Sequence, residues 1–89
     1  MMTENLPFFN PDDYPAFRRM IGSDLPDTYD EWLQLHTKEK RELSNVGHSI
    51  RVIKIYPDDF ARFLSARGQR ANFSTLRAFT SEKAARNEY

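Results

Sequence analysis

The stretch Ser49-Ile50-Arg51-Val52-Ile53-Lys54-Ile55-Tyr56 decides the fold of this chain. It is rich in β-branched and aromatic residues and is followed at once by Pro57, so it is the one convincing strand in the sequence. Its apolar residues fall on both faces, with Ile53 and Ile55 together on one of them. We therefore expect this strand to be buried on both sides or covered by a partner.

Directly after the strand, residues 57–68 echo a pattern that residues 11–22 show first. Both segments open with Pro-Asp-Asp, carry an aromatic residue three positions after the Pro, and end in Gly. The pattern predicts two helices in which Phe17 and Phe63 are matching core anchors. Two interpretations stay open: a duplicated unit of extended segment, helix, loop and helix, or two independent uses of residues that start and stop helices well.

A longer helix is predicted at 28–45. It begins with Thr28-Tyr29-Asp30-Glu31, which is typical of a capping box because the Thr hydroxyl and the Glu side chain can both satisfy backbone groups of the first turn. Apolar periodicity is lost at 37–42, so we expect that portion to be solvated. Ser74, which follows Gly68 as Thr28 follows Gly22, is expected to cap the last helix.

Together these elements predict an α+β fold that is mostly α, with three to four short helices around one main strand at 49–56. One version of this fold consists of two pseudo-repeated units. We expect an N-terminal arm at 1–10, a single small domain at 11–85 and a frayed tail at 86–89. Leu6–Phe9 is the other segment that could pair with the main strand, and Pro7 restricts it to an edge.

Length and composition exclude several classes of protein. Eighty-nine residues make one small domain with a thin core. The absence of cysteine excludes disulfide scaffolds, thiol nucleophiles and metal sites built on thiolate. No apolar run is long enough to span a membrane, and the first residues lack the basic and apolar regions of a signal peptide. We expect a cytoplasmic protein with no membrane contact.

Candidate catalytic groups are few. The acidic pairs of the two Pro-Asp-Asp segments already complement the positive end of a helix dipole. His36 and His48 are far apart in sequence, and no cysteine lies near either. The three glycines are isolated, so no phosphate-binding loop is present. We therefore expect neither an enzyme nor a resident cofactor or metal.

Charge is balanced over the whole chain but uneven along it. Residues 1–49 carry 5 basic and 9 acidic side chains, whereas residues 50–89 carry 8 basic and 4 acidic ones. Either the charges of the two halves complement each other, or residues 50–89 form a basic surface that binds an anion such as nucleic acid.

The favoured function is that of a non-catalytic binding module, acting as an adaptor, inhibitor or regulatory partner of another protein. Trp, Tyr and Arg dominate interface hot spots, and a lone strand leaves backbone groups unpaired. The predicted interaction residues are Trp32, Tyr29, Arg51, Ile53 and Ile55. A homodimer through strand 49–56 is the second form of this hypothesis.

The alternative is a small DNA-binding regulator. From Ile50 onward, the order of strand, Pro, helix, Gly loop and helix resembles that of ribbon-helix-helix proteins. The resemblance implies a dimer that pairs two strands into a ribbon for the DNA major groove. Its nucleic-acid contacts would come from the basic half: Arg51, Lys54, Arg62, Arg67, Arg70, Arg77 and Lys83.

Overall fold

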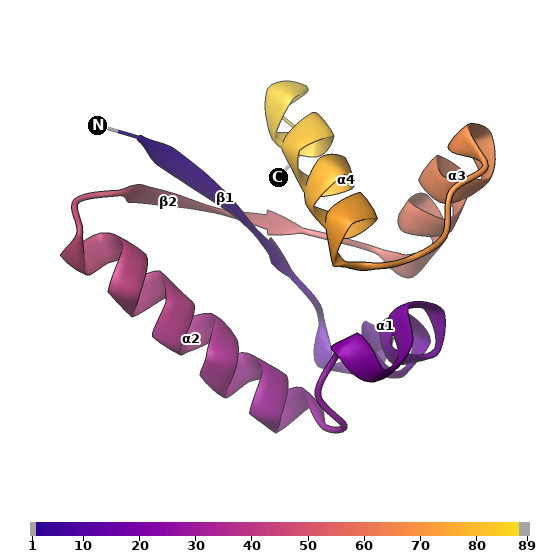
Figure 1. Cartoon of the computed structure of the whole chain (residues 1–89), viewed down its shortest axis with the longest axis horizontal. Helices are drawn as coiled ribbons and strands as arrows, with labels where there is room; N and C mark the ends of the chain where they lie inside the picture. The colour runs from indigo at the N-terminus through magenta and orange to yellow at the C-terminus, as the bar shows by residue number, and fades with distance from the viewer. Residues whose placement is uncertain (1, 88–89) are drawn as a thin grey trace.

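The computed structural model describes residues 2–87 and orders their elements as strand, helix, helix, strand, helix, helix (Figure 1). In chain order the elements are β1 (Thr3–Phe8), the short 3-10 helix η1 (Pro11–Asp13), α1 (Tyr14–Ile21), the 3-10 helix η2 (Gly22–Asp24), α2 (Tyr29–Asn45), β2 (Ser49–Lys54), α3 (Pro57–Arg67) and α4 (Phe73–Ala85). Within the described residues, four α-helices and one two-stranded sheet confirm the mostly α, α+β fold class.

The sheet consists of β1 and β2 running parallel, in a register that pairs Thr3 with Ser49 and Phe8 with Lys54. The segment expected as an N-terminal arm thus supplies one of the two strands, and its Leu6 and Phe9 belong to the buried core. Residues 3–9 therefore pack as part of the folded domain. The tail expected at 86–89 lies partly outside the described residues.

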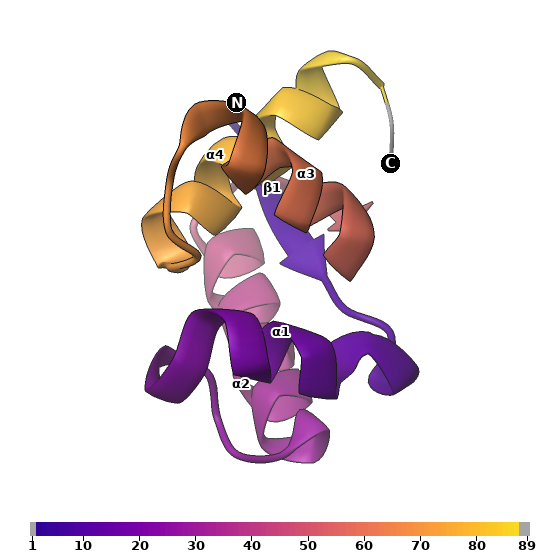
Figure 2. The same ribbon diagram turned by 90° about the vertical axis from the view of Figure 1, so that its right-hand side faces the viewer.

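Helices cover both faces of this sheet (Figures 1 and 2). The two views place α2 on one side and α4 on the other, with α3 beside α4 and α1 at the carboxyl end of β1. A parallel pair needs a long crossover between its strands, and here η1, α1, η2 and α2 make that connection.

Burial of the main strand differs between its two faces. Ile53 and Ile55 are fully buried, whereas Val52 and Tyr56 keep 38% and 41% of their surface exposed. The expectation of burial on both sides is wrong for the second face, because the neighbouring helices leave Val52 and Tyr56 partly uncovered there. The strand also stops at Lys54, since Tyr56 is the extended residue that precedes α3.

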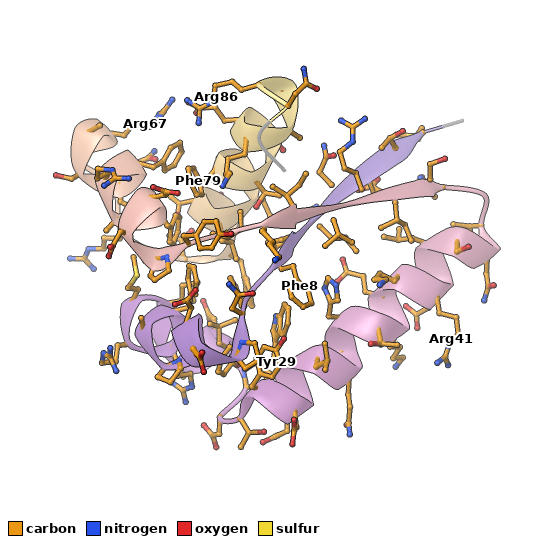
Figure 3. All side chains as sticks on the ribbon, turned by 180° about the vertical axis from the view of Figure 1, so that it is seen from behind. Phe8, Tyr29, Arg41, Arg67, Phe79 and Arg86 are labelled. Carbon is orange, nitrogen blue, oxygen red and sulfur yellow. The ribbon has the colours of Figure 1, made fainter. Side chains whose placement is uncertain are left out.

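Helix α2 begins where its capping residues predict. The Thr28 hydroxyl accepts a hydrogen bond from the Glu31 backbone N–H at 3.2 Å and donates one to the Glu31 carboxylate at 2.9 Å. The Glu31 carboxylate therefore hydrogen-bonds to the Thr28 hydroxyl. The polar portion at 37–42 is exposed except for the half-buried Lys40, which confirms that prediction, and Arg41 points away from the body of the protein in Figure 3.

We expect Thr28→Ala to lower the free energy of unfolding by about 1 kcal/mol, because it leaves the Glu31 N–H without its acceptor. Urea denaturation of the purified protein measures this. Ser44→Ala, at an exposed position near the other end of α2, is the matched control and should change stability by less than about 0.5 kcal/mol. Equal stabilities for both variants would contradict the cap.

The core is built largely of aromatic rings. Phe9 stacks on Phe17 with centroids 4.3 Å apart, and Phe60 joins Phe17 at 6.2 Å to Phe79 at 5.6 Å. Phe17 is fully buried and Phe63 is 8% exposed, so both predicted anchors belong to the core. Offset and tilted ring pairs of this kind add to the stabilisation that comes from burial alone.

The two echoed segments are separated in the chain by the same number of residues as the paired positions of β1 and β2. Pro57 follows Pro11 by 46 residues, and the register of the strands pairs residues with the same separation. Both echoed glycines have positive φ, with Gly68 in the left-handed conformation that ends helices. The prediction for the last cap is wrong: Asn72, not Ser74, caps α4.

Asn72 and Thr75 form a reciprocal capping box at the start of α4. The Asn72 side-chain oxygen accepts from the Thr75 backbone N–H at 3.0 Å, and the Thr75 hydroxyl accepts from the Asn72 backbone N–H at 3.0 Å. Because two pairs of groups are satisfied at once, this start is favoured over one that begins at Ser74.

Candidate protein-binding groove

The predicted interaction residues do not form one surface. Ile53 and Ile55 are fully buried, so in the folded chain they are core residues and are not available to a partner. Arg51 is half-buried on the same strand. Tyr29 is half-buried as well, and Trp32 is buried beside a hollow that a partner could reach.

Trp32 and Tyr29 lie where α2 meets the end of β1. The Trp32 ring is 8% exposed and lies 4.8 Å from the Phe9 ring and 4.9 Å from the His36 ring. The Tyr29 hydroxyl donates to the Phe9 carbonyl at 3.0 Å. Figure 3 shows Phe8 and Tyr29 on the inner side of α2. Both α2 residues therefore hold the helix to β1, and Trp32 in addition lines the hollow beside it.

That hollow is a groove of about 470 Å³ running along β1 between α2 and α4. Its floor is β1 from Glu4 to Pro7. Two large apolar side chains on its walls are exposed: Leu35 of α2 at 57% and Phe73 of α4 at 45%. Exposed apolar side chains on facing walls of a hollow are a feature of binding sites.

Two polar atoms belonging to groove residues lack hydrogen-bond partners. Nε2 of His36 and Oδ1 of Asn5 are both buried, and no described residue bonds to either. Buried polar atoms in folded proteins are nearly always hydrogen-bonded, because leaving one unpaired costs about 1–3 kcal/mol. Because both atoms are closed off from solvent, they do not face the open groove, and their side chains would have to turn to meet a bound molecule.

The environment of His36 favours its neutral form. Burial lowers the pKa of the imidazole, and the positive charge of Lys40 lowers it further. The ring is stacked on Trp32 and in edge contact with Phe8, so a proton added to it would sit among aromatic side chains. At neutral pH the groove therefore contains an uncharged histidine.

This pKa shift predicts that acidification destabilises the fold. As pH falls below the ordinary histidine pKa of about 6.5, the unfolded chain takes up a proton that folded His36 resists. The stability that comes from keeping His36 neutral is fully present above that value. It is lost as pH falls from that value to the lowered pKa of folded His36. Urea denaturation at about pH 7.5 and about pH 5.5 should show a smaller pH effect in His36→Gln than in the parent. An unchanged pH effect would contradict the assignment.

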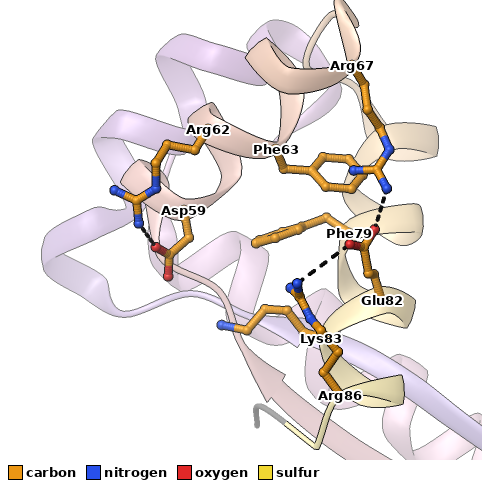
Figure 4. A pocket seen from close by; sticks show the side chains of 8 residues that line it. All are labelled: Asp59, Arg62, Phe63, Arg67, Phe79, Glu82, Lys83 and Arg86. Atoms are coloured by element: carbon orange, nitrogen blue, oxygen red, sulfur yellow. Dashed lines mark hydrogen bonds and ion pairs between the residues drawn. The ribbon is translucent and has the colours of Figure 1, made fainter.

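The basic residues proposed for nucleic acid are dispersed. Arg62, Arg67 and Lys83 line a second hollow of about 320 Å³ between α3 and α4, Arg77 lines the groove, and Arg51, Lys54 and Arg70 line neither. Figure 4 shows Arg62 paired with Asp59, and Arg67 and Arg86 converging on Glu82. The guanidinium groups of this hollow thus already face carboxylates of the same chain.

Lys83 has a structural role. The residue is 6% exposed, and its ammonium group donates to the Lys54 carbonyl at 3.0 Å, which ties α4 to the end of β2. The ammonium also lies 5.4 Å from the centre of the Tyr56 ring. In addition, β2 pairs with β1 of the same chain, whereas the ribbon-helix-helix arrangement needs that strand to pair with a second copy.

Comparison with known proteins leaves the groove as the main guide to function. No family model, curated protein or solved structure matches the chain. Among residues 2–87, no three acidic or histidine side chains gather in a way that could hold a metal ion. None of the helices described has the length and apolar character that crossing a bilayer requires.

Proposed function

We propose that this chain is a non-catalytic binding module whose partner is another protein. The observation that carries the proposal is the groove along β1, with exposed Leu35 and Phe73 on its two walls. An adaptor, an inhibitor or a regulatory subunit would each use such a surface. The groove offers apolar contact area together with charged lining residues, which are two ingredients of a specific protein interface.

Site-specific photo-cross-linking tests this proposal. A photoreactive residue replaces Leu35 in one variant and Val46 in another, since both side chains are exposed but Val46 does not line the groove. In extract of the source cells, Leu35 should yield a discrete protein adduct that Val46 does not. The adduct should also weaken when Phe73→Lys places a charge on the opposite wall.

Matching adducts from both positions, or none from Leu35, would count against the function. An adduct at Leu35 that Phe73→Lys leaves unchanged would mean that the partner contacts α2 alone, outside the groove.

A further inference from the structure

The groove exposes the backbone of an unpaired strand edge. The Met2 and Phe8 carbonyls accept hydrogen bonds from Ser49 and Ile55 of the second strand. Because alternate residues of a parallel strand turn their backbone groups to opposite edges, Thr3, Asn5 and Pro7 direct theirs away from β2. Within residues 2–87 the sheet has no third strand.

The position of this edge matches the groove. Figure 1 shows β1 passing in front of β2, with α2 on one side of it and α4 on the other. Asn5 and Pro7, whose backbone groups point outward, are both floor residues. Pro7 has no N–H, so it offers a carbonyl only, while Asn5 offers both a donor and an acceptor.

The charges lining the groove are unequal. Glu4, Asp24 and Glu39 contribute three carboxylates, and Arg77 contributes one cation. Electrostatic complementarity therefore favours an occupant with an excess of positive charge.

We propose that the groove binds an extended, net-basic segment of a partner protein, which adds to β1 as a third strand. This inference rests on the proposed function and names the kind of partner. Strand addition satisfies the outward groups of Thr3, Asn5 and Pro7, while alternate side chains of the segment face the α2 wall and the α4 wall.

A second copy of the chain is a poorer occupant than an extended segment. A symmetric contact places the same surface of both copies face to face. Here that surface is hollow, with walls formed by Leu35 and Phe73, and two hollows do not fill one another. A single extended chain has the shape that lies between two helices along a strand.

Selection from a library of random linear peptides about ten residues long, which is a typical upper strand length, supplies the probe. Selected peptides should carry a net positive charge. Leu35→Lys should weaken their binding by on the order of tenfold or more, and Val46→Lys, exposed but outside the groove, should not. Glu39→Lys should also weaken binding, whereas the reversal at exposed Glu42, which does not line the groove, should have little effect.

N-methylation of each peptide nitrogen in turn tests the binding mode. Strand addition predicts an alternating result, because only every second peptide N–H faces β1. In the protein, hydrogen exchange of the Thr3 and Asn5 amides should slow when peptide is bound, while that of Leu6 changes little because its backbone groups already turn to β2.

The outcomes separate the two proposals. Groove-dependent binding without the alternating N-methyl pattern would overturn strand addition and leave the protein-binding function standing. If selection yields no peptide whose binding is weakened by Leu35→Lys, strand addition is likewise overturned, even if the Leu35 cross-link to a protein is observed. Absence of both the peptide and the cross-link would remove the function as well.

Discussion

Replacing Phe60 by Ala should bring the chain close to unfolding. Phe60 is fully buried and its ring lies between Phe17 of α1 and Phe79 of α4, so it joins the first half of the protein to the second. Truncating a buried Phe costs roughly 3–5 kcal/mol through lost burial and the cavity that remains. A small domain has only about 5–15 kcal/mol of stability in total.

The measurement is chemical denaturation followed by the fluorescence of Trp32, the single tryptophan. Phe73→Ala is the matched control because that ring is 45% exposed. It should cost less than about 1 kcal/mol. If both variants lost equal stability, the aromatic core would not be the link between the two halves.

Ile53→Lys should prevent folding, whereas Val52→Lys should be tolerated. The two residues are neighbours on β2, but Ile53 is fully buried and Val52 is 38% exposed. No Asp or Glu is among the buried residues that the structure describes, so a lysine at position 53 would have no carboxylate to pair with in the core. Burying an unpaired charge costs several kcal/mol. Circular dichroism and one-dimensional NMR of the two purified variants distinguish folded from unfolded chain.

This pair of variants also decides between two roles of the strand. If 49–56 were chiefly a contact between two copies, Ile53→Lys would give a folded chain that no longer self-associates. Light scattering over a concentration series would show that result. Folded, monomeric Ile53→Lys would contradict the core position of this side chain.

The local elements could be predicted from sequence, because the residues that define them are neighbours in the chain. β-Branched residues before Pro57 indicated β2, and Thr28 with Glu31 indicated the start of α2. The last cap was missed because Asn72 and Ser74 are both good capping residues, and a second bond from Thr75 favours Asn72.

The groove could not be predicted in this way. Its lining residues come from β1, α2, α4 and the segment between α1 and α2, which only the tertiary structure brings together. Leu35 falls beside the apolar face of its helix, and nothing nearby in the sequence indicates that Phe73 stands across from it. One signal was available: Pro7 in an apolar segment indicated an edge strand, and an edge strand has a side open to a partner.

The parallel register has a consequence for the order of events during synthesis. β1 is translated before β2, and the edge of β1 that pairs with β2 has no partner until a strand 46 residues later in the chain has been made. At ordinary translation rates that delay is on the order of several seconds. During it, α1 and α2 can form from local contacts while β1 stays without its partner strand. Pairing of parallel strands that are distant in the chain is slow compared with helix formation, so we expect sheet pairing to be the late step in the folding of this protein.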